Sequence, residues 1–231
     1  MKPSMPAMIL AAGKGTRLPS WTNHTPKPLV PVAGEPVIFR TLQQLAAAGF
    51  ERVVINTHHL AEQLHQQVGD GQKWGVKVQW SPEALLLETG GGVRQALSLL
   101  DEAQFLVING DILWQLDLGP LLSGFDGATM DGLLGLVANP ADGRGDFVRG
   151  ADGRLARGRG AAGSLTYSGI QILSQQAVAR YPIEPFSLNR LYDDAMAAGR
   201  LQGVVLNGFW ADMGTPQRLA DAERVLRENM V

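Results

Sequence analysis

The stretch Ala7-Met-Ile-Leu-Ala-Ala-Gly-Lys-Gly-Thr-Arg17 joins a short apolar run to a glycine-rich, basic loop. A continuous apolar run closed by a glycine is typical of a strand that is buried on both faces of a parallel sheet. In open α/β sheets, ligands bind beyond the carboxyl ends of the strands. We therefore expect the loop after Ala12 to form part of a ligand site.

Strand-like and helix-like patterns alternate after this first strand. They predict strands at Arg52–Asn56, Val76–Trp80 and Phe105–Asn109, and helices at Val37–Ala48, Leu60–Val68 and Gly92–Leu100. Alternation at this spacing predicts an α/β fold, with an open, mostly parallel, Rossmann-like sheet that helices cover on both faces.

The second half of the chain is less regular. Here the patterns predict strands at Gly132–Ala138, Leu165–Leu173 and Leu201–Leu206, and helices at Leu188–Ala198 and from Thr215-Pro216 to about Asn229. The glycine- and arginine-rich stretch Asp142–Gly163 contains Phe147, Val148 and Leu155, so we expect a hairpin or flap rather than a linker. The 231 residues are expected to form a single domain.

Charge and composition exclude several classes of protein. Twenty basic against 22 acidic residues leave a net charge of −2, which gives no general field to attract nucleic acid or an anionic membrane. The absence of cysteine excludes disulfides, thiol nucleophiles and iron–sulfur clusters. No apolar run approaches the ~18 residues of a membrane span, and the N-terminal stretch is a poor signal peptide. A cytoplasmic protein is expected.

The loop after the first strand has the chemistry of a polyphosphate site. Gly13 and Gly15 let backbone N–H groups face a ligand without a Cβ in the way. Lys14, Arg17 and Lys27 place three cations within fifteen residues, in a chain with only five lysines. Leu18 stands where a dinucleotide fingerprint needs its third glycine, and no earlier glycine completes a P-loop. A solvated basic loop is the less favoured alternative.

Two carboxylates are candidates for a metal site. Asp111 follows the strand Phe105–Asn109 and should emerge at the carboxyl edge of the sheet, while Asp212 precedes the helix cap at Thr215. Carboxylate oxygens suit Mg²⁺, although each aspartate could instead serve a turn or a helix cap. Two carboxylates that share one ion repel each other when the ion is absent, so an asparagine variant is expected to be at least as stable.

Six short motifs occur in the order that one enzyme family uses. They are Gly13-Lys-Gly-Thr-Arg-Leu18, Thr25-Pro-Lys-Pro-Leu29, Glu88-Thr-Gly-Gly-Gly92, Asn109-Gly-Asp111, Tyr167-Ser-Gly169 and Trp210-Ala-Asp-Met-Gly-Thr215. Together they resemble the sugar-1-phosphate nucleotidyltransferases over nearly the whole chain, and most of all the short N-acetylmuramate 1-phosphate uridylyltransferases. The chain departs from the family pattern at Pro19-Ser20, where an arginine and a proline are usual, and it lacks the Glu-Lys pair before Tyr167, which Arg157 or Arg159 could replace.

The resemblance implies a GT-A-like domain that joins a nucleoside triphosphate to a sugar 1-phosphate and releases pyrophosphate. UTP with an amino-sugar 1-phosphate such as N-acetylmuramic acid 1-phosphate is the expected pair. The alternatives are a guanylyltransferase acting on mannose or heptose 1-phosphate and a catalytically silent regulatory homologue that binds a nucleotide sugar. No nucleic-acid or membrane partner is expected, and the oligomeric state stays open.

The resemblance also assigns roles to residues. It makes Arg17 and Lys27 catalytic, on the pyrophosphate and the α-phosphate, and places Mg²⁺ between Asp111 and Asp212. The half 1–111 is expected to bind the nucleotide through Leu10, Ala11, Ala12, Gly13, Lys14, Gly15, Thr16, Glu88, Thr89, Gly90 and Gly91, whose small residues let a base lie against backbone. The half 112–231, together with Asn109, is expected to bind the sugar through Asn109, Asn139, Asp146, Tyr167, Ser168, Gly169 and Trp210.

Overall fold

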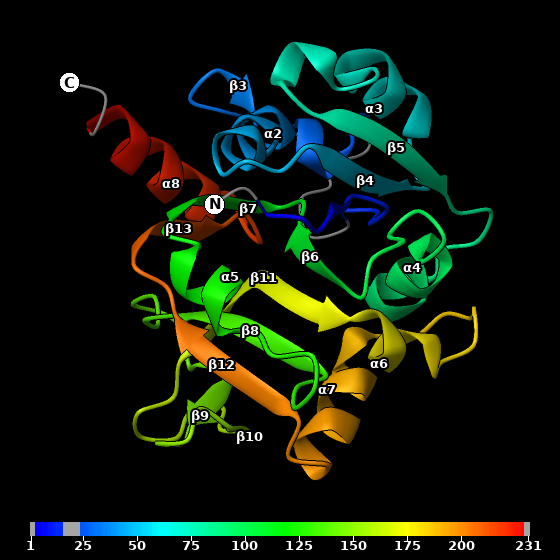
Figure 1. Cartoon of the computed structure of the whole chain (residues 1–231). Helices are drawn as coiled ribbons and strands as arrows, with labels where there is room; N and C mark the ends of the chain where they lie inside the picture. The colour runs from blue at the N-terminus through cyan, green and yellow to red at the C-terminus, as the bar shows by residue number, and fades with distance from the viewer. Residues whose placement is uncertain (1–2, 16–23, 229–231) are drawn as a thin grey trace.

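The computed structural model describes residues 3–15 and 24–228, without the side chains of 227 and 228. Its centre is a seven-stranded sheet in the order β12-β8-β11-β6-β1-β4-β5 (Figure 1). The strands are β1 (Ala7–Leu10), β4 (Arg52–Thr57), β5 (Lys77–Pro82), β6 (Gln104–Asn109), β8 (Gly132–Val137), β11 (Thr166–Ser174) and β12 (Leu201–Val205). Only β11 among them is antiparallel to its neighbours, so the predicted mostly parallel sheet is confirmed.

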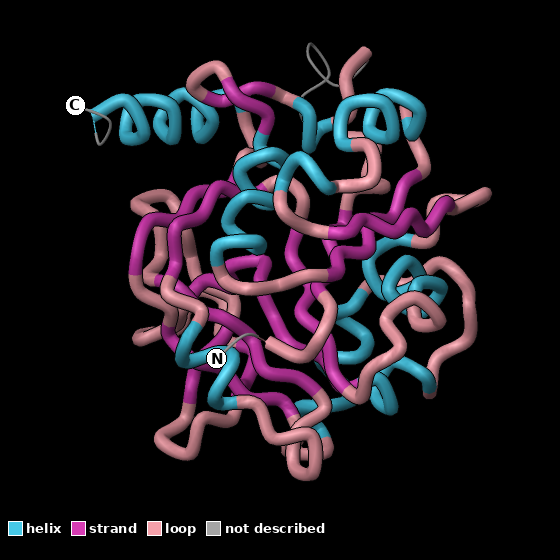
Figure 2. The backbone as a smooth tube through the Cα atoms, turned by 45° about the horizontal axis from the view of Figure 1, so that its top comes forward, coloured by secondary structure: helices cyan, strands magenta, loops and turns pink. Residues whose placement is uncertain are grey.

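Helices cover both faces of this sheet, as the alternating pattern predicts (Figures 1 and 2). One face packs against α2 (Val37–Ala47), α3 (Ala61–Val68) and α5 (Gly119–Gly124), and the other packs against α4 (Glu88–Ala96), α6 (Gln175–Ala179) and α7 (Leu188–Ala197). Within β1, Ile9 lies in the first of these cores and Met8 in the second. The run is therefore continuously apolar because both of its faces are buried.

Three small antiparallel pairs flank the sheet. They are β2 (Pro31–Val32) with β3 (Glu35–Pro36), β7 (Ile112–Leu116) with β13 (Gly208–Asp212), and the hairpin β9 (Phe147–Arg149) with β10 (Leu155–Arg157). The hairpin confirms the interpretation of Asp142–Gly163. The β7–β13 pair is not apparent from the sequence, because its partners are separated by almost half of the chain.

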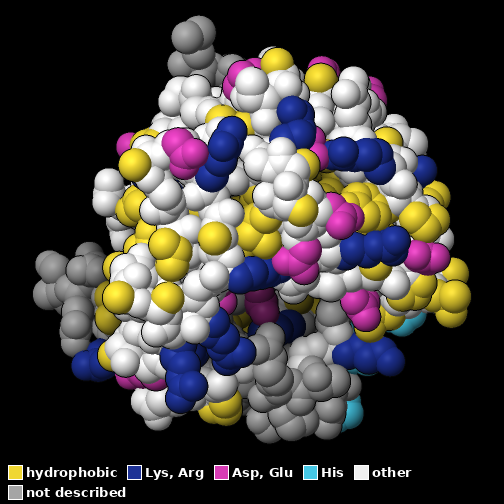
Figure 3. All heavy atoms as spheres, turned by 90° about the horizontal axis from the view of Figure 1, so that it is seen from below, with side chains coloured by type: hydrophobic (Ala, Val, Ile, Leu, Met, Phe, Trp, Pro, Cys, Tyr) yellow, Lys and Arg dark blue, Asp and Glu magenta, His cyan; other side chains and the backbone are white. Residues whose placement is uncertain are grey.

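The last helix, α8 (Pro216–Glu228), joins early and late parts of the chain. Its Leu219 and Leu226 share a small core with Val30, Val32 and Leu113. Short 3₁₀ turns occur at Lys27–Leu29 and Gln72–Trp74. Within the described part of the chain, no helix has the length and apolar character needed to cross a membrane. Basic and acidic side chains are interspersed over the face shown in Figure 3.

Helix α4 begins at Glu88, four residues before the expected start at Gly92. Glycine is a poor helix former, which is why the sequence pattern places Gly90 and Gly91 before the expected helix. A Cβ on Gly90 would lie 2.3 Å from the Phe186 ring, and a Cβ on Gly91 would lie 2.2 Å from the carbonyl oxygen of Glu184. Close packing against residues 184–186 therefore requires glycine in this first helical turn. This tertiary contact outweighs the low helix propensity of glycine.

Candidate active site

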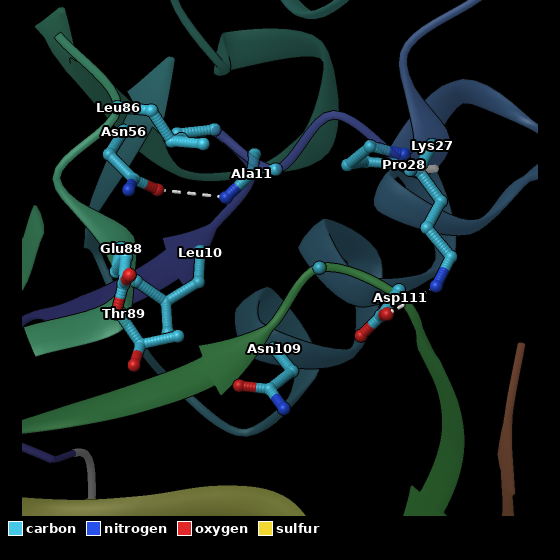
Figure 4. Close-up of a pocket in the computed structure, with 14 residues that line it drawn as sticks. Leu10, Ala11, Lys27, Pro28, Asn56, Leu86, Glu88, Thr89, Asn109 and Asp111 are labelled. Carbon is cyan, nitrogen blue, oxygen red and sulfur yellow. Dashed lines mark hydrogen bonds and ion pairs between the residues drawn. The ribbon is translucent and has the colours of Figure 1, made fainter. Parts of the chain in front are cut away.

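A first cavity of about 350 Å³ opens at the carboxyl ends of β1, β4 and β6 (Figure 4). Its wall is made by Leu10, Ala11, Ala12, Gly13, Gly15, Lys27, Pro28, Asn56, Leu86, Glu88, Thr89, Asn109, Gly110 and Asp111. In Figure 4, Leu10, Glu88 and Thr89 lie on one side, while Lys27 and Asp111 point toward each other on the other side. One side of the cavity is thus formed mostly by backbone and uncharged side chains, together with Glu88, and the other side carries the charges of Lys27 and Asp111.

A chain of buried hydrogen bonds fixes the side of the cavity that holds Leu10 and Glu88. The N–H of Ala11 donates to Asn56 Oδ1 (2.8 Å), and Asn56 Nδ2 donates to Glu83 Oε1 (2.7 Å). The second oxygen of Glu83 accepts from the N–H of Leu87 (2.9 Å). Glu83 is 5% exposed, so its carboxylate serves the protein rather than solvent. This chain ties the end of β1 to the segment that begins α4.

Lys27 and Asp111 form an ion pair on the charged side. Lys27 lies in a 3₁₀ turn and is 7% exposed, and its Nζ is 2.5 Å from Asp111 Oδ2. Asp111 follows β6 and is less buried than Lys27, with 31% of its side chain exposed. A buried ammonium group is stable here because the carboxylate supplies its counter-charge.

A second cavity of about 380 Å³ lies beside the first and shares Asn109 and Asp111 with it. The other residues that line it are Ile112, Pro140, Asp142, Gly143, Arg144, Gly145, Asp146, Arg159, Thr166, Tyr167, Ser168, Gly169, Trp210, Asp212, Gly214 and Arg218. Most of these residues come from loops, from the base of the β9–β10 hairpin and from strand ends. Charged side chains are far more frequent here than in the first cavity.

The β7–β13 pair brings the two candidate metal ligands together. Asp212 is opposite Ile112 in this ladder, and the N–H of Met213 donates to the carbonyl oxygen of Asp111 (3.0 Å). Both carboxylates line the second cavity. The expected juxtaposition is therefore present, through a strand pairing that the sequence does not reveal.

Each of the two carboxylates already has a cationic partner. Arg218, in the first turn of α8, pairs with Asp212 and also with Asp142, at 2.9 Å. Hydrogen bonding to Arg218 lowers the pKa of the Asp142 carboxyl below its ordinary value, and Asp142 in turn is the main cause of a raised pKa at Arg218. Because each aspartate is paired with a cation, the repulsion expected between the two carboxylates is weakened in this structure.

Several predicted nucleotide-site residues line the first cavity, and others do not. Leu10, Ala11, Ala12, Gly13, Gly15, Glu88 and Thr89 are in its wall. Lys14 is exposed and lines neither of the two cavities. Gly90 and Gly91 are also outside them, and the N–H groups of both donate to the carbonyl oxygen of Phe186. The structure thus gives these two glycines a packing role, and their expected contact with a base stays a prediction.

The predicted sugar-site residues divide in the same way. The residues Asn109, Asp146, Tyr167, Ser168, Gly169 and Trp210 line the second cavity, and Trp210 Nε1 donates to the carbonyl oxygen of Ser168 (2.7 Å). The side chain of Ser168 is fully buried, and its Oγ donates to the carbonyl oxygen of Gly135 rather than to the cavity. Asn139 is absent from the cavity wall, because its amide joins Ser164 and Thr166.

Two of the predicted sugar-site residues on β11, Tyr167 and Gly169, also have structural roles. The Tyr167 ring packs edge-on against Tyr192 at 6.0 Å, and burial raises its pKa well above the ordinary value. Gly169 has a φ of +81°, and a Cβ there would lie 2.9 Å from Asn109 Nδ2. The strand register shifts between Tyr167 and Gln171, so this glycine allows β11 to bulge beside the cavity.

Arg17 and Thr16 lie outside the residues that the structure describes, so their predicted roles stay predictions. Sequence reasoning missed Asn56, Glu83 and Arg218. The position of Asn56 at the end of a predicted strand was a usable signal, because strand ends line such sites. Of the two candidate replacements for the missing Glu-Lys pair, Arg159 lines the second cavity, whereas Arg157 pairs with Asp193.

Comparison with known proteins identifies the family. A family model described as nucleotidyl transferase matches residues 6–144, more than half of the chain. An N-acetylmuramate alpha-1-phosphate uridylyltransferase of Neisseria meningitidis is 39% identical, over 95% of this chain and 97% of its own length. The protein of the same name in Caulobacter vibrioides is 36% identical, over 96% and 97% of the two chains.

A solved structure has the same fold. HddC from Yersinia pseudotuberculosis, complexed with GMP-PN, is 26% identical and superposes with a TM-score of 0.82, covering 96% of this chain and 99% of its own. The matched residues 6–144 contain the whole wall of the first cavity. The chain therefore belongs to the nucleotidyl transferase family, which confirms the resemblance that its motifs indicate.

Proposed function

We propose that this protein joins UTP to N-acetylmuramic acid 1-phosphate, forming the UDP-sugar and pyrophosphate. The observation that carries the proposal is the pair of adjoining cavities that meet at Asn109 and Asp111, with the Lys27–Asp111 ion pair beside their shared wall. Two substrates bound in such cavities would present their phosphates to each other at this wall. The names and the near full-length match of the two relatives support the choice of substrates.

The reaction needs no protein nucleophile. An oxygen of the sugar phosphate attacks the α-phosphorus of the triphosphate, and the bond to pyrophosphate breaks on the opposite side. The attacking oxygen is already anionic, so catalysis consists of positioning and of stabilising charge. Lys27 is placed for the second task, because it is a buried cation in the wall nearest to the shared residues.

The donor set fits a divalent metal. Nucleotidyltransferases of this family generally use one, and Asp111 and Asp212 offer the oxygen ligands that Mg²⁺ prefers. Each carboxylate keeps oxygen lone pairs in addition to those that face Lys27 or Arg218. When bound, Mg²⁺ neutralises charge on the phosphate oxygens. Asp111 and Asp212 would hold it at the shared wall.

The remaining assignments follow from the two cavities. The nucleotide lies in the first cavity, against Leu10–Gly13, Gly15, Glu88 and Thr89. The family resemblance adds Thr16 to the nucleotide contacts and assigns Arg17 to the leaving pyrophosphate. The sugar lies in the second cavity, near Asp146 and Trp210. A cytoplasmic location, where nucleoside triphosphates are made, belongs to the same proposal.

A substrate panel tests this function. Pyrophosphate release is measured with UTP, GTP, CTP and ATP against the 1-phosphates of N-acetylmuramic acid, N-acetylglucosamine and mannose, with and without a chelator. We expect the highest kcat/KM for UTP with N-acetylmuramic acid 1-phosphate, and loss of turnover with the chelator. A guanylyltransferase is the second candidate, because a mannose-1-phosphate guanylyltransferase of Mycobacterium tuberculosis is 31% identical over 91% of this chain. Highest turnover with GTP, or binding without turnover, would overturn the proposal.

A further inference from the structure

Two arginines in the second cavity have side chains without a hydrogen-bonding or ionic partner among the residues that the structure describes. Of the arginines whose side chains the structure describes, Arg144 and Arg159 are the two whose guanidinium groups make no hydrogen bond or ion pair. Both are exposed and both line this cavity. The other described arginines are bound to carboxylates or to backbone carbonyl groups.

Backbone contacts hold these two arginines next to each other. The N–H of Gly160 donates to the carbonyl oxygen of Arg144 (2.6 Å), and Ser164 Oγ donates to the same oxygen (3.2 Å). The N–H of Gly158 donates to the carbonyl oxygen of Asp146 (3.0 Å). The segments 143–146 and 157–160 therefore run side by side at the base of the β9–β10 hairpin, and both guanidinium groups belong to one wall.

The acidic residues of the cavity do not neutralise this wall. Asp111 is paired with Lys27, and Asp142 and Asp212 are both paired with Arg218. Asp146 accepts a hydrogen bond from the N–H of Tyr167 (2.9 Å). Within the described part of the chain, this wall thus holds two arginines whose side chains are unpaired and one carboxylate, Asp146, that accepts only from a backbone N–H, so it can accept an anionic group from a ligand.

The 1-phosphate of the sugar does not account for this wall. In the proposed reaction that phosphate must reach the nucleotide, so it lies at the residues shared by both cavities, Asn109 and Asp111. Arg144 and Arg159 line the second cavity and are absent from the first. Guanidinium groups match carboxylates particularly well, because their planar N–H groups can bind both oxygens.

We propose that Arg144 and Arg159 bind a carboxylate carried by the sugar, and that they select acidic sugar 1-phosphates over neutral ones. This inference rests on the proposed function and deepens it. N-acetylmuramic acid carries such a carboxylate on its lactyl ether, whereas N-acetylglucosamine is the same amino sugar without that group. The arginine pair determines specificity and takes no part in the bond-forming step.

The test compares the two sugars in single variants. Arg144→Gln and Arg159→Gln are each expected to lower kcat/KM for N-acetylmuramic acid 1-phosphate by roughly 10- to 100-fold, mostly through KM, since a hydrogen bond to a charged group contributes about that factor. For N-acetylglucosamine 1-phosphate the change is expected to stay within about threefold, because its carboxylate is missing. Arg144→Lys keeps the charge but loses the planar fork, and an intermediate loss is expected.

Arg154→Gln is the matched control, because this exposed arginine of the same hairpin pairs with Asp152 and lines neither cavity. The Arg154→Gln variant should leave kcat/KM unchanged for both sugar 1-phosphates. Equal losses for both sugars in the Arg144 and Arg159 variants would overturn the inference, because the arginines would then serve the shared phosphate. Wild-type preference for a neutral sugar would overturn it as well. Absence of turnover with every pair in the panel would instead refute the proposed function itself.

Discussion

The first cavity is walled mainly by backbone and small side chains at the ends of three parallel strands, whereas charged side chains on loops and strand ends wall the second. A chain of hydrogen bonds through Asn56, which ends on the accepting carboxylate of Glu83, fixes the shape of the first. Ion pairs through Arg218 organise the second. Shape complementarity suits a flat base and a flexible triphosphate, while a wall of charges can discriminate among sugars that differ in one group.

The largest effect is expected where the two cavities meet. Asp111→Asn should lower the rate of pyrophosphate release by roughly 10²–10³-fold, by analogy with the loss of one electrostatic group from an active site. It should also lower the free energy of unfolding by about 1–3 kcal/mol, because buried Lys27 loses its counter-charge. Stability is measured by urea denaturation.

This result would separate two views of the same residue. Repulsion between carboxylates, the expectation from sequence alone, predicts unchanged or higher stability for Asp111→Asn. Asp117→Asn is the control, because Asp117 is exposed and accepts from the N–H of Gly119, a role that asparagine can keep. A variant that is as stable as the wild type would show that the Lys27–Asp111 pair does not contribute to folding.

A smaller effect is expected from loosening the first cavity alone. In Glu83→Gln, an amide N–H₂ group must face either Asn56 Nδ2 or the N–H of Leu87, so one buried hydrogen bond is lost. We expect KM for UTP to rise about tenfold, since roughly 1–3 kcal/mol is at stake, and kcat/KM ratios between sugars to stay unchanged. Glu62→Gln, on the exposed side of α3, is the control. A changed preference between sugars would contradict the separation of the two cavities.

Two glycines, Gly13 in the wall of the first cavity and Gly90 outside it, should respond differently to alanine. Gly90→Ala forces a methyl group against the Phe186 ring, so the free energy of unfolding should fall by about 1–3 kcal/mol. At Gly13 a Cβ would meet nothing within 4 Å. Gly13→Ala should therefore change stability by less than about 0.5 kcal/mol but weaken UTP binding, measured by calorimetry. Unchanged affinity in Gly13→Ala would show that this backbone does not approach the triphosphate.

The smallest effect is expected on the thermal stability of the protein at low pH, through the Asp142–Arg218 ion pair of the second cavity. The pKa of Asp142 is lowered in the folded state by Arg218, so this pair stabilises the protein above the unfolded pKa of about 4 and loses that effect as pH falls through the lower folded value. Arg218→Gln should lower Tm slightly at pH 7, and the difference from the wild type should shrink as the pH approaches 3. A difference in Tm that is constant from pH 7 to 3 would assign the effect of Arg218 to packing.

The regular half of the fold was predictable, and the reason lies in local patterns. The run Ala7–Leu10 has Met8 in one core and Ile9 in the other, which is the arrangement that a continuous apolar run predicts. Strand β6 ends at Asn109, so Asp111 could be placed at the sheet edge from sequence. Both features could be predicted because burial within one strand, and position directly after a strand, leave a local pattern in the sequence.

The charged wall was much less predictable. Arg218 contacts Asp142, 76 positions earlier, and no local pattern distinguishes this arginine from others on α8. The meeting of Asp111 with Asp212 depends on the β7–β13 pairing, which has no turn signal because its strands are far apart in sequence. The packing of Gly90 and Gly91 has no local signal either, because Phe186, which both of them contact, lies almost a hundred positions later.

The position of β13 and α8 has a consequence for synthesis of the protein. At about 5–20 residues per second, a ribosome makes Asp212 roughly 5 to 20 seconds after Asp111. During that interval the nascent chain can form β1, β4 and β6 around the first cavity, because all three strands precede Asp111. The second carboxylate and Arg218 arrive with the strand and helix that close the second cavity. The residues that wall the first cavity are thus all made before those that complete the second, so the second cavity is the later of the two to be completed during synthesis.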